Sequence, residues 1–199
     1  MDRTRFALVV FAFALLTAFA AATSAAPSVG TFEITGGYAK SSTEVAPATA
    51  PTDAMGGSLG FGAGYFRSIA PTTSWGVEVA YDNLGSVDWN TGTATATSSS
   101  HVFRVTPEFR VNFGAPVGPS FFAQGGMGLY SVSSKVETTD TAFALDGSQS
   151  KFGFNVGAGV GFPVGPKTKL NFQGNYHSIS TEGTSVNYIG VRAGLGFNL

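Results

Sequence analysis

The C-terminal stretch 188–199 alternates strictly between two kinds of side chain. Its apolar residues occupy every second position, and glycines and polar residues lie between them; the apolar set is Ile189, Val191, Ala193, Leu195, Phe197 and Leu199. Successive side chains of a β-strand leave it on opposite sides, so this alternation predicts a strand with one apolar and one polar face. The pattern runs to Leu199, and we expect the strand to do the same.

The same period of two recurs along the chain. It predicts strands over residues 30–41, 55–67, 74–84, 101–113, 120–133, 151–162, 167–180 and 188–199. In the fifth strand the alternation is less regular, and we expect Phe121, Met127 and Leu129 on its apolar face, together with Ala123 and Gly125. In the fourth strand Pro107 lacks a backbone N–H, so we expect a bulge or local irregularity there.

The connections between these strands differ in length. Stretches 42–54, 85–100 and 134–150 are long and polar, 68–73, 114–119 and 163–166 are short, and 181–186 is intermediate. Long and short connections that alternate are typical of an up-and-down barrel with loops at one end and turns at the other. The fold class expected is therefore all-β: an eight-stranded antiparallel up-and-down transmembrane β-barrel.

This arrangement resembles the small eight-stranded OmpA/OmpX-type barrels of the bacterial outer membrane. The C-terminal strand is similar to the closing signal of that family at Arg192, Gly194, Phe197 and Leu199, although the usual last residue is aromatic. The resemblance implies a Gram-negative outer-membrane protein whose N- and C-termini are periplasmic. It also implies that the barrel-assembly machinery reads the C-terminal strand during insertion.

The N-terminal stretch is typical of a cleavable signal peptide. Arg3 and Arg5 precede an apolar run, and small residues lie ahead of Pro27. We expect a signal peptide over residues 1–26 and a barrel domain over residues 27–199. Cleavage after Ala22 and an uncleaved membrane anchor are the alternatives.

Side-chain volume decides which face of the strands is outward. An eight-stranded barrel has an interior just wide enough to be filled by side chains, and the apolar faces are too bulky for it. We therefore place the apolar faces on lipid, with aromatic girdles that include Trp75, Tyr81, Tyr38, Tyr65, Phe113 and Phe162.

The polar faces then supply a barrel-interior charge network. Its members are Glu33, Glu78, Asp82, Arg104, Glu108, Arg110, Lys151, Lys169 and Arg192. Charges removed from bulk water need partners, and acids and bases occur here in similar number. We expect a polar, plugged interior; a water-filled path lined by these charges is the alternative.

Several kinds of chemistry have little support in the sequence. There is no Cys, which excludes thiolate sites, and no basic stripe that would indicate nucleic acid. Barrel enzymes that trim lipid A carry a His and a Ser two residues apart, whereas Ser178 is adjacent to His177 and Ile179 follows. We expect no enzyme activity, no cofactor and no metal.

The sequence predicts a structural or surface-interaction protein with long extracellular loops. Its expected partners are outer-membrane lipids, the assembly machinery and an extracellular partner at the loops, where Trp89 is a candidate anchor; we expect a monomer. A narrow pore or small-molecule transport barrel is the alternative, and a lipid-modifying enzyme is a third hypothesis.

Overall fold

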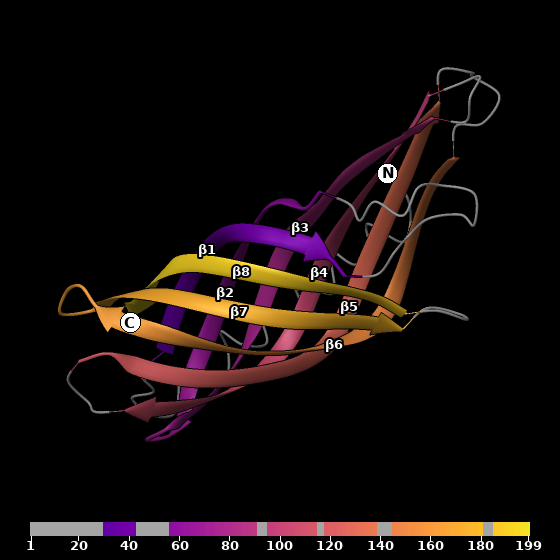
Figure 1. Ribbon diagram of the computed structural model, residues 1–199. Helices are drawn as coiled ribbons and strands as arrows, with labels where there is room; N and C mark the ends of the chain where they lie inside the picture. The colour runs from indigo at the N-terminus through magenta and orange to yellow at the C-terminus, as the bar shows by residue number, and fades with distance from the viewer. Residues whose placement is uncertain (1–29, 43–55, 91–94, 115–117, 139–144, 181–184) are drawn as a thin grey trace.

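The computed structural model describes residues 30–42, 56–90, 95–114, 118–138, 145–180 and 185–199. These residues form eight antiparallel strands that close into a barrel, each paired with its neighbours in sequence and β8 paired with β1 (Figure 1). The strands are β1 (Gly30–Ser41), β2 (Ser58–Ala70), β3 (Thr73–Asn90), β4 (Thr95–Gly114), β5 (Ser120–Thr138), β6 (Leu145–Pro163), β7 (Thr168–Ser180) and β8 (Ser185–Asn198). The predicted signal peptide, with both cleavage sites, and nearly all of the first polar connection lie outside the described residues.

The last strand closes the barrel on the first. Phe197 of β8 lies opposite Phe32 of β1, and the backbone N–H of Leu199 donates to the carbonyl of Gly30 at 2.8 Å. The eight predicted strands are confirmed, and β1 has the predicted bounds. The start of β1 and the end of β8 lie at the barrel end that also carries the turns after β2, β4 and β6, which we call the turn end (Figure 1). The opposite end is the loop end.

Two of the three predicted long loops are wrong. Residues 85–100 and 134–150 are mostly strand, because β3 runs to Asn90, β4 begins at Thr95, β5 runs to Thr138 and β6 begins at Leu145. These stretches lack apolar alternation because they stand outside the apolar part of the barrel. Their backbone groups pair within the β3–β4, β4–β5 and β5–β6 ladders, and threonine favours extended backbone.

A β-bulge in β3 marks where this strand continues beyond its predicted end at Leu84. The register with β4 shifts between Asn83 and Gly85; Gly85 has a φ of +90°, and its N–H donates to Asn83 Oδ1 at 2.9 Å. A bulge adds one residue to one strand and so changes which residues face inward. Tyr81, before the bulge, shares the outward face with Phe61, whereas Val87, after it, packs against the buried interior cluster.

Pro107 disturbs the ladder without shifting it. In the pairing with β5, Val105–Leu129 and Glu108–Gly126 belong to one register. Thr106 and Pro107, which lie between Val105 and Glu108, are not paired with β5 residues. The expected irregularity is therefore a local gap in pairing, and the alternative prediction of a bulge at Pro107 is wrong. The ordered pairs on both sides hold the register across the missing N–H.

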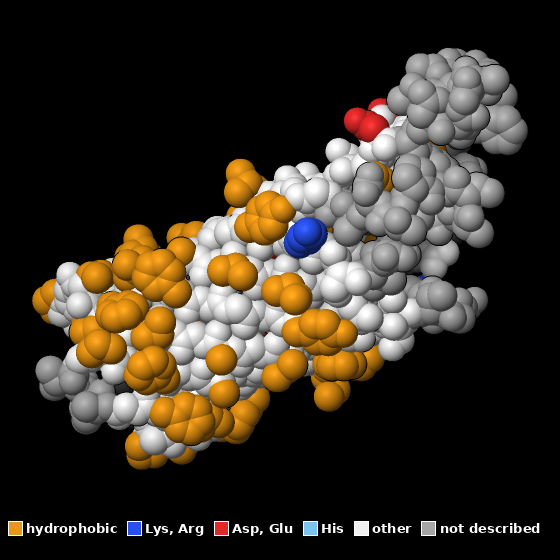
Figure 2. Space-filling model, viewed as in Figure 1, with side chains coloured by type: hydrophobic (Ala, Val, Ile, Leu, Met, Phe, Trp, Pro, Cys, Tyr) orange, Lys and Arg blue, Asp and Glu red, His pale blue; other side chains and the backbone are white. Residues whose placement is uncertain are grey.

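The apolar faces point outward, as volume predicted. Large side chains on every strand are exposed, among them Phe61, Phe121, Met127 and Phe152, and the predicted facing of β5 is confirmed. Figure 2 shows hydrophobic side chains gathered over the part of the barrel nearer the turn end, with a polar surface beyond them. In the part of the chain that is described, no helix is long and apolar enough to cross a membrane.

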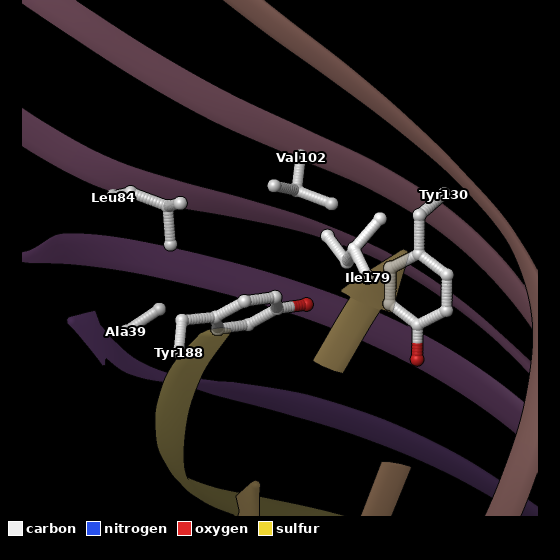
Figure 3. Close-up of a cluster of buried hydrophobic side chains, with 6 residues drawn as sticks. All are labelled: Ala39, Leu84, Val102, Tyr130, Ile179 and Tyr188. Atoms are coloured by element: carbon white, nitrogen blue, oxygen red, sulfur yellow. The ribbon is translucent and has the colours of Figure 1, made fainter. Parts of the chain in front are cut away.

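The interior is mostly polar, and six of its buried apolar and aromatic side chains form one layer toward the loop end. This layer consists of Ala39, Leu84, Val102, Tyr130, Ile179 and Tyr188, all of them buried (Figure 3). The six residues come from six different strands, so together they cross the lumen. All six occupy polar-face positions of the alternation, which are the inward-facing positions of their strands.

Candidate functional site

The charged interior is the candidate site, and one ion pair crosses it near the turn end. Arg110 of β4 donates to both carboxylate oxygens of Glu33 on β1, with Nη1–Oε1 at 2.6 Å and Nη2–Oε2 at 3.0 Å. Asn171 also donates to Glu33 Oε1 at 3.0 Å, and Arg110 Nε donates to Gln124 Oε1 at 3.1 Å. Both charges are therefore held by several polar partners, which a buried pair requires.

Two inward-facing aromatic rings hold the guanidinium of Arg110. Its central carbon lies 3.9 Å from the centre of the Phe66 ring and 4.4 Å from that of Phe122. A cation over an aromatic face is attracted by the ring quadrupole, and more strongly when water is excluded. These interior aromatics were not among the predicted interior residues, although both occupy polar-face positions of the alternation.

A second cluster of charges lies nearer the loop end. Arg192 donates to Glu78 Oε1 at 2.8 Å and also to Asp82. Arg104 donates to Glu78 and lies 3.4 Å from Asp82 through its Nε, and the hydroxyl of Tyr188 donates to Asp82 Oδ2 at 3.0 Å. Each arginine bridges both carboxylates, so the four charges form one closed unit across β3, β4 and β8.

Glu108 lies beside this cluster and is also buried. Its Oε1 accepts from Thr106 Oγ1 at 3.1 Å and from Asn155 Nδ2 at 3.0 Å, and it lies 3.5 Å from Arg104 Nη1. Of the nine residues predicted for the interior, seven are buried in these contacts. Lys151, opposite Tyr130 on β5, and Lys169, opposite Gly196 on β8, are only half-buried.

His177 belongs to the interior and faces away from lipid. Its Nδ1 lies 3.3 Å from the hydroxyl of Tyr130, and its ring stacks on Tyr188 with centroids 4.3 Å apart. The neighbouring Ser178 lies on the opposite face of β7, and Ile179 is fully buried. The His–Ser pair of the lipid A-trimming barrels is thus not formed by these residues. Within the described residues, no group of three His, Asp or Glu side chains is arranged to hold a metal ion.

Three of the four residues of the C-terminal pattern lie on β8, which ends at Asn198, one residue before the predicted end at Leu199. Arg192 reaches into the lumen, and Gly194 packs closely against Thr35 of β1. Phe197 is half-buried opposite Phe32, and Leu199 is exposed at the turn end. Trp89 pairs with Ala96 in the part of the β3–β4 ladder beyond Gly85. The structure does not describe the Trp89 side chain.

Comparison with known proteins identifies the fold family. A family model described as outer membrane protein beta-barrel domain matches residues 11–198. A sequence search of curated proteins gave no significant match.

Solved structures of the same architecture are similar over most of the chain. Neisserial surface protein A is 15% identical, with a TM-score of 0.59, over 85% of this chain and 97% of that one. The N-terminal barrel of Pseudomonas aeruginosa OprF is 12% identical, with a TM-score of 0.52, over 86% and 99%. The Yersinia pestis attachment invasion locus protein Ail, in complex with the heparin analogue sucrose octasulfate, is 17% identical, with a TM-score of 0.51, over 85% and 99%. The chain therefore belongs to the outer membrane protein beta-barrel domain family and is a small eight-stranded β-barrel of the bacterial outer membrane.

Proposed function

We propose that this protein is a non-catalytic barrel with a structural and surface-interaction role, which it performs through the sheet that extends beyond the barrel. This extension consists of the loop-end parts of β3, β4, β5 and β6. The observation that carries the proposal is its pairing. The β2–β3 ladder stops at Gly60–Asp82 and the β6–β7 ladder starts at Gly153–Ile179, whereas β4 and β5 remain paired as far as Ala96–Thr138.

Among the described residues, the outer ladders of β3 and β6 end before these strands do. Beyond Asp82 on β3, and before Gly153 on β6, the described residues provide no further strand on the outer side, although Gly56 and Gly57 lie against Gly85 and Ser86 where the β3 edge begins. Unpaired backbone N–H and C=O groups along a strand favour addition of an extended segment from another chain. An edge of this kind supports an extracellular polypeptide as the partner.

The surface of the extension is polar and rich in hydroxyl groups. Ser133 donates to Ser148 Oγ at 3.1 Å across the β5–β6 pair, and Lys135 pairs with Glu137 on the same exposed surface. Side chains of this kind suit contact with a hydrated partner and are poorly suited to lipid. The proposed orientation follows: extension outside the cell, and the turn end with both termini in the periplasm.

The interior supports a closed barrel. Two ion-pair clusters, the Phe66 and Phe122 rings and the apolar layer fill the lumen with buried side chains. We propose a monomer that contacts outer-membrane lipids and, during insertion, the barrel-assembly machinery. In planar bilayers the purified protein should show no stable unitary currents; such currents would favour the narrow-pore alternative.

Cysteine labelling tests the orientation, because the native chain has no Cys. Ser148 lies exposed on the extension, and Val164 lies exposed in the turn between β6 and β7. On intact cells, a membrane-impermeant maleimide should label Ser148→Cys and should label Val164→Cys only after the outer membrane is permeabilised. The reverse result would overturn the proposed orientation and, with it, the surface role.

A further inference from the structure

The buried charges of the interior do not balance. Among the described residues, four buried carboxyl groups (Glu33, Glu78, Asp82 and Glu108) accompany three buried guanidinium groups (Arg104, Arg110 and Arg192). Glu33 and Arg110 neutralise each other, and Arg104 and Arg192 match Glu78 and Asp82. Glu108 is the remaining acid. An unmatched buried charge is costly, so this carboxyl needs a cation or a proton.

The two carboxyl oxygens of Glu108 have different surroundings. Thr106, Asn155 and Arg104 all approach Oε1, whereas Oε2 is buried without a hydrogen-bond partner. An ionised carboxylate has two equivalent acceptor oxygens and is stabilised when both are bonded. Donors gathered on one oxygen, with none on the other, are the pattern of a carbonyl oxygen beside a hydroxyl oxygen.

Asn155 shows the complementary pattern. Its Nδ2 donates to Glu108 Oε1 at 3.0 Å and to the hydroxyl of Tyr130 at 3.4 Å, which uses both amide protons. Its Oδ1 is buried and has no donor. The two atoms without partners therefore belong to the two residues that already share a hydrogen bond.

We propose that Glu108 is a proton-binding site: its Oε2 carries a proton and donates it to Asn155 Oδ1, which closes a cyclic acid–amide pair. One proton then provides both missing partners and leaves the buried charges of the lumen balanced. The charged and titratable groups around the site are Glu78 and Asp82 of β3, Arg104 and Arg110 of β4, Tyr130 of β5, His177 of β7, and Arg192 and Tyr188 of β8.

His177 is a weaker place for the same proton. The hydroxyl of Tyr130 lies 3.3 Å from His177 Nδ1 and is able to donate to it, because Asn155 donates to the Tyr130 oxygen. A second ring proton would give His177 a positive charge close to the positive charges of Arg104 and Arg192. The arginines do not replace the proton at Glu108 Oε2 either, because Arg110 is bonded to Glu33, and Arg104, which donates to Glu78, Asp82 and Thr106, approaches Glu108 only at Oε1.

Infrared spectroscopy tests the proposal on the full-length barrel reconstituted in lipid at neutral pH. The wild-type protein should show the C=O stretch of a protonated carboxylic acid. Glu108→Gln should lose that band, whereas Glu33→Gln, the matched control in the other cluster, should keep it. Absence of the band from the wild-type protein, as expected for an ionised Glu108 with a bound monovalent cation, would overturn the proposal.

Stability provides a second and independent readout. In Glu108→Gln the new NH₂ group replaces the proposed O–H and can donate to Asn155 Oδ1, so the urea midpoint should stay at the wild-type value or rise. Glu33→Gln should lower it, because Arg110 loses its counter-charge. A fall in the Glu108→Gln midpoint as large as that of Glu33→Gln, or failure of Glu108→Gln to assemble, would show that the carboxyl acts as an anion.

Discussion

Arg110 and Glu33 face each other across the lumen, and each Nη of the guanidinium donates to one carboxylate oxygen. The two residues come from β4 and β1, which are not neighbours in the barrel wall. The pair therefore links β4 directly to β1, the strand on which β8 closes. Such a link acts on the whole barrel, since neither strand can move from the wall without separating two buried charges.

Loss of one partner of this pair should be more harmful than loss of both. We expect Glu33→Ala to lower the free energy of unfolding by about 3–5 kcal/mol, because it leaves the buried Arg110 uncompensated. The double variant Glu33→Leu, Arg110→Met should recover much of this loss. Urea unfolding in detergent compares the double variant with Glu33→Leu and Arg110→Met alone; a double variant as unstable as the sum of these two single variants would show that the two residues act independently.

Closure at the C-terminal strand should decide assembly. We predict that Phe197→Asp, or deletion of residues 197–199, yields protease-sensitive material without heat-modifiable mobility. Backbone groups left unpaired in lipid each cost several kcal/mol, and these residues face β1 and the turn end. Leu199→Phe is the control and should assemble normally or faster, because it restores the terminal aromatic of the family pattern. Normal barrel yield from the deletion would show that closure does not depend on this segment.

The bulge glycine should be irreplaceable. Gly85 has a positive φ, and a Cβ at this position would lie 2.7 Å from the backbone N of Gly57. Gly85→Ala should destabilise the extension by about 1–3 kcal/mol, the usual scale for backbone strain. Hydrogen exchange of β3 and β4 amides should detect this as faster opening. Gly147→Ala on β6 should leave exchange unchanged, since Gly147 has open space around it.

Inward and outward glycines should respond oppositely to an added methyl group. A Cβ on the inward Gly159 would collide with the Phe122 ring and with the Phe172 carbonyl, whereas Gly174 on the outward face has nothing within 4 Å. Gly159→Ala should therefore reduce the yield of folded barrel. Gly174→Ala should be tolerated, because the methyl group enters open space. Electrophoretic mobility with and without heating separates the two outcomes.

Period-two alternation was sufficient for the wall of the barrel, because lipid and lumen impose opposite requirements on successive residues. Phe61 and Glu78 are on the sides that this requirement gives them. The extension could not be predicted in the same way, since Ser98 and Ser133 stand where neither lipid nor a packed core selects side chains. The register shift at Gly85 adds one residue and reverses the alternation beyond it, and no repeated sequence pattern predicts this change.

The interior was predictable as a set of charges but not as a set of pairs. The stagger between strands determines which inward residues meet, and it brought Arg110 to Glu33, 77 residues away in sequence. The rings of Phe66 and Phe122 follow from their position in the alternation. Side-chain bulk predicts lipid exposure for apolar residues in general and does not distinguish the few, such as Phe66 and Phe122, that lie in the lumen.

The extension also determines how far the molecule reaches. β4 contains 20 residues; at about 3.3 Å per residue and a tilt of roughly 40°, it rises about 50 Å along the membrane normal. The apolar band of such barrels is about 25 Å tall. In the proposed orientation Thr95, where β4 begins, lies well beyond the lipid headgroups, at a height where an antibody or another cell's surface protein can bind the β3–β4 pair without touching the membrane.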